Sequence, residues 1–222
     1  MNTIQAVIFD MDGLMIDTER IAQRAWQLAG AEGGYEFDDA TYVQAVGRTR
    51  NDTKLVFQEA FGVDFPFDEL YERKQQIMHD LIDTEGIPTK SGLFELYDLI
   101  DELGIAKAVA TSTARPTALK KLTIVNALDR FSIIVCGNEI ANGKPAPDIF
   151  LEAAARLKIP PVNCIVLEDS EAGIRAAHAA GMTPIIIPDM KQPSAEIVEL
   201  SAYVFPSLWD VQPILRKLIV NP

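Results

Sequence analysis

The sequence predicts an α/β domain built around a parallel sheet, with an all-helical insert near its start. Short runs that are apolar throughout recur along the chain and alternate with helical patterns, which is typical of strands buried on both faces of a parallel sheet. Between about Asp17 and Glu85 the pattern is helical throughout, without a convincing strand. With 222 residues, the chain is long enough for one large domain or two smaller ones.

Six apolar runs are predicted to be strands of the sheet. They cover 4–9, 106–111, 132–136, 163–168, 183–187 and, more weakly, 202–205. Helices of the same domain are predicted at 92–104, 115–128, 147–158 and 171–181. Gly104 and Gly181 stand where helices often end, and Pro116 and Pro147 suit first turns. Open sheets of this kind bind ligands at the carboxyl ends of their strands, so the residues that follow each run are the candidates for function.

The insert is predicted to be a separate cap domain. Its helical segments cover 19–30, 37–47, 50–62 and 67–83. The turns after Met15 and before Gly86 would link it to the rest of the chain. We therefore expect residues 1–16 and 86–222 to form the α/β core domain and residues 17–85 to form the helical cap.

The composition argues against nucleic-acid and membrane partners. The formal net charge is −12 and the pI is about 4.6, so the surface repels the phosphates of nucleic acids and anionic membranes. No apolar stretch approaches the roughly eighteen residues of a membrane span, and no signal peptide is evident. Cys136 and Cys164 are expected to be buried free thiols, which suits the reducing cytoplasm where we expect the protein. The sequence leaves the oligomeric state open.

Carboxylates follow two of the predicted strands. The first strand leads into Asp10 and Asp12, and the fourth leads into Glu168 and Asp169. If the backbone stays extended, Asp10 and Asp12 point to the same side. Several carboxylates at one sheet edge are costly unless a cation neutralises them, and hard oxygen ligands of this kind select Mg²⁺. We therefore expect these four residues to form a Mg²⁺ site.

Hydroxyls and a lysine complete the groups expected for phosphoryl transfer. Thr111 and Ser112 follow the second strand and precede a helix whose first amides suit phosphate oxygens. Lys144 supplies a positive charge that can pair with an aspartate and with a phosphoryl group. Each feature alone has an ordinary structural explanation, as a turn, a helix cap, a strand residue or a loop charge. Their occurrence together after apolar strands favours the functional interpretation.

The same segments resemble the four motifs of the haloacid dehalogenase-like hydrolases. These are VIFDMDGLMIDTE at the start, VATST at the second strand, then GKPAPDIF, and VLEDSEAGI at the fourth strand. The last two motifs are similar to the branch that contains β-phosphoglucomutase and small sugar-phosphate phosphatases. The resemblance covers the whole chain and implies a Rossmann-like core with a mobile helical cap.

The resemblance implies a role for each core residue. Asp10 would be the nucleophile that forms an aspartyl-phosphate. Asp12 would be the general acid and base, and its backbone carbonyl would also reach the metal. Thr111 and Lys144 would orient the phosphoryl group and balance its charge. The acidic pair after the fourth strand would bind the metal.

For the cap, the resemblance implies substrate contacts. The segment from Val46 to Arg50 resembles the substrate loop of this branch, and Arg50 aligns with an arginine that grips the distal group of the substrate. The expected substrate contacts of the cap are Thr18, Gly47, Arg50 and Lys74. Mutases of the branch carry a lysine where Val46 stands and a histidine where Ala22 stands. Both departures argue against mutase activity.

The leading hypothesis is a Mg²⁺-dependent phosphatase that acts on a small phosphorylated metabolite, such as a sugar phosphate. An intramolecular phosphomutase with the same nucleophile is the alternative, and a catalytically idle binding relative is the third. The intact motif set argues against the idle relative. A nucleotide-binding P-loop does not fit, because GKP at 143–145 lacks the Ser or Thr that follows the lysine. Dehalogenation is compatible with the fold, but Asp12 and the acidic pair point to phosphorus and metal chemistry.

Overall fold

The chain divides into two compact units in the computed structural model, which describes residues 3–220. One unit extends to Ile16 and resumes at Pro88, and the other is Asp17–Ile87. The predicted cap, residues 17–85, ends two residues before the end of the second unit. No helix among the described residues is long and apolar enough to cross a bilayer.

Six parallel strands form a single sheet in the first unit. The strands are β1 (Ala6–Phe9), β2 (Ala106–Thr111), β3 (Ile133–Cys136), β4 (Cys164–Glu168), β5 (Thr183–Ile186) and β6 (Tyr203–Val204). Their order across the sheet is β3-β2-β1-β4-β5-β6. Each strand lies within one of the predicted apolar runs and pairs in parallel with its neighbours, so the predicted α/β fold is confirmed.

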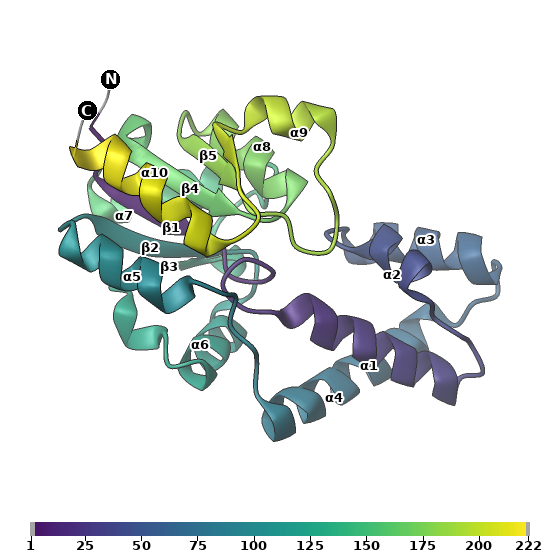
Figure 1. Cartoon of the computed structure of the whole chain (residues 1–222). Coiled ribbons are helices and arrows are strands. Elements are labelled where there is room, and N and C mark those ends of the chain that lie inside the picture. Colours follow the sequence, from purple (N-terminus) through teal and green to yellow (C-terminus); the bar gives the residue numbers. More distant parts are fainter. Residues whose placement is uncertain (1–2, 221–222) are drawn as a thin grey trace. The chain divides into compact units, whose positions relative to one another are not determined.

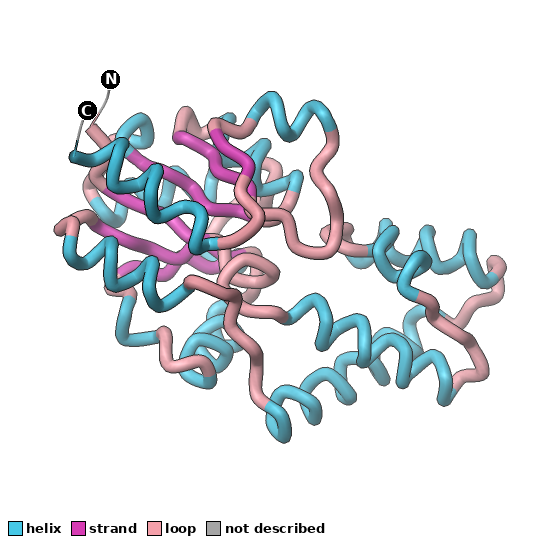
Figure 2. Tube along the Cα trace, viewed as in Figure 1, coloured by secondary structure: helices cyan, strands magenta, loops and turns pink. Residues whose placement is uncertain are grey.

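Helices cover both faces of the sheet (Figures 1 and 2). They are α5 (Leu93–Glu102), α6 (Arg115–Ile124), α7 (Asp148–Leu157), α8 (Glu171–Ala179), α9 (Ala195–Leu200) and α10 (Leu208–Val220). α7 and α8 pack on the face that carries Ile8 and Val166. On the opposite face, Tyr97 of α5 meets Phe9 edge-to-face at a centroid distance of 5.4 Å, and α10 packs against α5. Because both faces are covered, the central strands β1, β2 and β4 are mostly apolar.

The strand order brings the carboxyl ends of β1, β2 and β4 together at the centre of the sheet. β1 pairs with β2 on one side and with β4 on the other over its whole length. From β1 the sheet extends to β3 in one direction and to β6 in the other. Ligands of open α/β sheets bind beside the carboxyl ends where the strand order reverses, so the fold directs attention to the residues after these strands.

Two helix predictions need correction at their ends. The predicted helix at 115–128 ends at Ile124, and a short 3-10 turn follows it. Pro147 does not stand in the first turn of α7 but immediately before it, at the capping position. Gly104 and Gly181 follow helix ends as expected, with φ of +68° and +70°.

The helices α9 and α10 are missing from the sequence-based predictions. Pro213 lies inside α10 and obscures its pattern, because proline is uncommon within a helix. Leu208, Val211 and Leu215 are nevertheless buried and are spaced for one face of a helix. That spacing is the signal from which α10 could have been predicted.

The two ends of the helical insert meet in the first unit. Ile16, just before the insert, forms an isolated antiparallel bridge with Thr89, just after it. The N–H of Lys90 also donates to the carbonyl of Met15 at 2.9 Å. The chain therefore leaves and re-enters the α/β unit at neighbouring points.

The second unit is helical and has its own core. Its helices are α1 (Thr18–Glu32), α2 (Asp39–Ala45), α3 (Arg50–Phe61) and α4 (Phe67–Glu85), which correspond to the predicted segments. The core is aromatic: Trp26 lies 5.5 Å from Phe37 in a stacked arrangement and 4.9 Å from Phe57 edge-on, measured between ring centroids. Phe57 is fully buried at the centre of this cluster.

Phe57→Ala is expected to destabilise the helical unit by about 3–5 kcal/mol, because it removes the central ring and leaves a cavity. Urea unfolding, followed by the fluorescence of Trp26 in a Trp209→Phe background, measures this change; these are the two tryptophans of the chain. Leu55→Ala is the matched control, since Leu55 lies on the same helix but is 65% exposed. The control should change stability by less than about 0.5 kcal/mol. Equal effects of the two substitutions would contradict the assignment of this core.

Candidate active site

Lys144 joins two carboxylates that lie at the ends of neighbouring strands. Asp10 directly follows β1, and Glu168 is the last residue of β4. The ammonium group of Lys144 donates to Oδ1 of Asp10, to Oε1 of Glu168 at 2.7 Å and to the carbonyl oxygen of Ala110 at 3.2 Å. These three bonds use all the donors of the lysine. The lysine and both carboxylates are buried.

Burial and charge act in opposite directions on these groups. Removal from water raises the pKa of Asp10 to about 7; Lys144 opposes this effect, and the charge of Glu168 adds to it. Burial alone would lower the pKa of Lys144, but the charges of Asp10 and Glu168 raise it above its usual range. The lysine therefore stays charged at neutral pH. A further cation beside Asp10 would favour the carboxylate, which is the nucleophilic form.

Glu168 is fixed by hydrogen bonds to both of its oxygens. Oε1 accepts from Lys144, while Oε2 accepts from the N–H of Asp169 at 3.0 Å and from the N–H and hydroxyl of Ser170, both at 2.9 Å. The Ser170 hydroxyl in turn accepts from the N–H of Gly173 at 3.1 Å and caps α8. A side chain at Gly173 would clash with the Glu168 carboxylate. Glu168 is thus placed to orient Lys144 and the start of α8.

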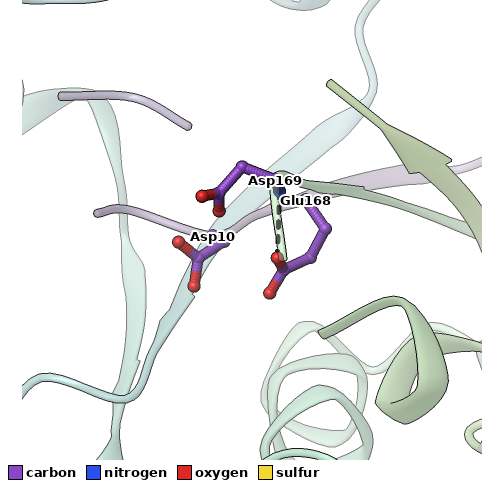
Figure 3. A group of neighbouring side chains, drawn as sticks. All are labelled: Asp10, Glu168 and Asp169. Carbon is purple, nitrogen blue, oxygen red and sulfur yellow. Dashed lines mark hydrogen bonds between the residues drawn. The ribbon is translucent and has the colours of Figure 1, made fainter. Parts of the chain in front are cut away.

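Asp10, Glu168 and Asp169 form a cluster of carboxylates (Figure 3). One oxygen from each lies within 4.8 Å of the others. The loop after β1 leaves room for this approach, because a Cβ at Gly13 would clash with Oδ2 of Asp169. Gly13 also has φ of +87°, a conformation that favours glycine. Three carboxylates at this spacing are a suitable donor set for a hard divalent cation.

The carboxylate of Asp12 is not one of the three in this cluster. Its Oδ2 accepts from the hydroxyl of Thr113 at 2.6 Å, and its Oδ1 accepts from the ammonium of Lys121 at 2.5 Å. Its side chain thus points toward α6 and lies outside the cation cluster, although its charge still acts on Asp10 and contributes to the raised pKa of that carboxyl. The chain continues along the sheet at Asp10, whose N–H donates to the carbonyl of Leu167, and the turn follows Asp12, at 13–15.

Lys121 is a residue that the sequence analysis missed. It lies in the helix that follows the predicted phosphate loop, next to a second lysine, Lys120. The presence of lysines in this helix was the signal from which a cation near the strand ends could have been predicted. Spacing alone could not decide which of the two lysines turns toward the strand ends.

Thr111 and Ser112 lie where β2 ends, on a loop that is tied to the next strand. Thr111 is buried, and its hydroxyl accepts from the N–H of Thr113 at 3.1 Å, whereas Ser112 is exposed. The segment after β3 approaches so closely that a side chain at Gly137 would clash with the Ser112 carbonyl. Asn138 accepts from the first N–H of α6 at 2.9 Å. These contacts fix the loop in which a phosphoryl group would be bound.

The residues predicted to contact substrate from the cap all lie in the second unit. Thr18 begins α1 and is buried. Gly47 stands in the turn before α3 with φ of +72°. Lys74 is nearly buried on α4 and donates to the side-chain oxygen of Gln75 at 3.1 Å. Their contact with substrate stays a prediction.

Arg50 is held by α4 of the same unit. Its guanidinium donates to Asp68 at 3.1 Å, lies 3.7 Å from the Glu72 carboxylate and stands 4.5 Å from the centre of the Tyr71 ring. The side chain remains 48% exposed. A grip on substrate by Arg50 would therefore have to replace these partners or add to them.

Comparisons with known proteins identify the family. The family model described as haloacid dehalogenase-like hydrolase matches residues 7–187. Protein CbbY of Rhodobacter capsulatus is 32% identical over 83% of this chain and 86% of its own, and a phosphorylated carbohydrates phosphatase of Thermotoga maritima is 28% identical over 82% and 84%. A solved structure of a CbbY mutant from Rhodobacter sphaeroides, in complex with xylulose-(1,5)bisphosphate, has a similar fold, with a TM-score of 0.71. Its sequence is 25% identical, and the match covers 93% of this chain and 95% of that chain. The chain therefore belongs to the haloacid dehalogenase-like hydrolases, as its four motifs predict.

Proposed function

We propose that this hydrolase is a Mg²⁺-dependent phosphatase that acts on a small phosphomonoester, with sugar phosphates as the substrate class. The observation that carries the proposal is the position of Asp10: it is a buried carboxylate at the end of the central strand, paired with Lys144 and facing Asp169. Phosphoryl transfer depends mainly on positioning and electrostatic stabilisation. We expect the enzyme to act in the cytoplasm, on a metabolite and not on a nucleic acid or a membrane.

The relatives support this substrate class. The CbbY structure contains xylulose-(1,5)bisphosphate, and the Thermotoga maritima relative is named for phosphorylated carbohydrates. Both names refer to small sugars with phosphate groups. A small anionic substrate also suits this chain. Its net charge is strongly negative, and the positive charge needed to bind a phosphate is confined to the lysines of the site.

The residues of the site fit Mg²⁺. Asp10 and Asp169 would hold the ion, with Glu168 beside them and the backbone carbonyl of Asp12 as a further oxygen ligand. The three carboxylates of the cluster carry three formal negative charges against the one positive charge of Lys144, which leaves two negative charges for a divalent cation to balance. When bound, Mg²⁺ would shield the repulsion between the attacking carboxylate and the phosphoryl oxygens.

The first step forms an aspartyl-phosphate. An Oδ of Asp10 attacks phosphorus, the bond from phosphorus to the leaving oxygen breaks, and the carboxyl proton of Asp12 passes to that oxygen. The buried ammonium of Lys144 balances charge on the transferred group, and the loop at Thr111 and Ser112 binds its oxygens.

The second step releases phosphate. Water attacks the phosphorus of the aspartyl-phosphate and gives a proton to the Asp12 carboxylate, while the bond from phosphorus to Asp10 breaks. Asp10 is thereby restored as a carboxylate, and Asp12 regains the proton it donated. A phosphatase must therefore admit water to the site while the aspartyl-phosphate is present. A mutase with the same nucleophile must exclude it.

The alternative function is an intramolecular phosphomutase. Such an enzyme must keep a bisphosphate intermediate while it reorients, so charged contacts from the cap would help it. Val46 offers no charge at the position where mutases of the branch carry lysine, and Ala22 replaces their histidine. These two positions favour the phosphatase.

Asp10→Asn should lower phosphate release by several orders of magnitude while the fold survives, because the amide keeps the shape but cannot attack phosphorus. The assay measures phosphate from a panel of sugar phosphates, nucleotides and phosphoglycolate, with Mg²⁺ and with excess EDTA. Asp129→Asn, at an exposed position, is the control and should behave like the unmodified chain. Near-normal turnover by folded Asp10→Asn, or full activity in EDTA, would refute the proposal.

Gly13→Ala should weaken Mg²⁺ binding by about 10- to 100-fold, because the added methyl group displaces Asp169. Titration calorimetry with Mg²⁺ measures the affinity directly. Gly104→Ala is the matched control: it also places alanine at a positive φ, but nothing lies within 4 Å of its Cβ. Unchanged affinity in Gly13→Ala would remove Asp169 from the proposed ion site.

With β-glucose 1-phosphate, we expect net release of inorganic phosphate over many turnovers and no requirement for a bisphosphate primer. Glucose 6-phosphate and free phosphate are measured in the same reaction. Val46→Lys should slow phosphate release without creating an efficient mutase, because one charged contact contributes only about 1.5–3 kcal/mol. Faster formation of glucose 6-phosphate than of free phosphate by the unmodified chain would establish the mutase instead.

A further inference from the structure

Each aspartate of the Asp10-Met11-Asp12 segment has its own lysine. Lys144 donates to Asp10, and Lys121 donates to Asp12 at 2.5 Å. The side chain of Lys121 is only 12% exposed, and that of Asp12 is 22% exposed. The Lys121 contact is therefore not one of the mobile ion pairs of the surface, which contribute little.

The geometry of α6 explains how Lys121 reaches the strand ends. The helix starts at Arg115, directly after the loop that follows β2, and Lys121 lies in its second half. Long side chains in a helix lean toward its N-terminus, so the ammonium group returns toward this loop. Thr113, in the loop, donates to the other oxygen of Asp12 at 2.6 Å. The carboxylate is thus held between the helix and the loop.

We propose that Lys121 is a positioning residue for Asp12. With Thr113, it holds the carboxylate on the side of α6, so that Asp12 does not join the cluster of Asp10, Glu168 and Asp169 as a further ligand. The inference rests on the proposed function, because it matters for catalysis only if Asp12 transfers protons. In the first step, the proton passes from the Asp12 carboxyl to the leaving oxygen while the phosphorus–oxygen bond breaks. A displaced Asp12 would slow that transfer without weakening substrate binding.

The test compares two substrates that differ in their need for a proton. A sugar phosphate releases an alcohol whose oxygen must be protonated, whereas p-nitrophenyl phosphate releases a stabilised phenolate that does not require it. Single-turnover reactions, with enzyme in excess over substrate, isolate formation of the aspartyl-phosphate. The variants are Lys121→Met, Lys121→Arg, Asp12→Asn and the double variant, with Lys120→Met as the matched control on the exposed side of α6. Thermal unfolding confirms that each variant is folded.

Lys121→Met should lower the single-turnover rate with the sugar phosphate by about 10- to 100-fold. It should have little effect on the rate with p-nitrophenyl phosphate or on the KM of either substrate. Lys121→Arg should retain most of the single-turnover rate with the sugar phosphate, and Lys120→Met should leave that rate unchanged. The double variant should be no slower than Asp12→Asn alone, because Lys121 acts through Asp12.

An equal loss on both substrates, a loss seen mainly in KM, or an additive loss in the double variant would overturn the inference and leave the proposed function intact. If Lys121→Met does not fold, Lys121→Arg and the double variant decide the question by the same two-substrate comparison. If Asp12→Asn itself does not discriminate between the substrates, the proton-transfer role in the proposed function fails, and the positioning role falls with it.

Discussion

Lys144 places its ammonium group between the ends of β1 and β4, where Asp10 and Glu168 would otherwise repel each other in a buried environment. Burying two carboxylates side by side is costly, and one fully bonded lysine offsets part of the lost hydration and of the repulsion. Glu168 links this ion pair to the following segment, because its second oxygen accepts hydrogen bonds from the N–H groups of Asp169 and Ser170. Asp10, its counter-ion Lys144 and the start of α8 are therefore parts of one hydrogen-bonded unit.

Much of this arrangement was predictable from the sequence. Fully apolar runs mark strands buried on both faces, and the residues that end such strands must meet at one edge of the sheet. The same reasoning predicts that Asp10, Lys144 and Asp169 are neighbours although they are far apart along the chain, and the structure brings them together. Hydrophobic periodicity also identified the helices of the insert, but it missed α10, where Pro213 interrupts the pattern.

The direction of individual side chains was not predictable in the same way. Asp12 is two residues from Asp10, but its carboxylate is held by Thr113 and by Lys121 of α6, whereas the carboxylate of Asp10 meets Lys144. Arg50 is expected from the family resemblance to contact substrate, yet it has two carboxylates and a tyrosine ring as partners within its own unit. Such choices depend on tertiary neighbours, which no local pattern contains.

The bridge between Ile16 and Thr89 has a consequence for how such a chain can diversify. Since the insert begins and ends at neighbouring points of the α/β unit, it can be exchanged for another segment without rerouting the strands around it. Its aromatic core is also its own, so sequence drift among those rings need not disturb the packing that supports Asp10. The insert and the unit that carries Asp10 can thus be inherited as separable modules, and one helical insert can be exchanged for another without moving the carboxylates at the strand ends.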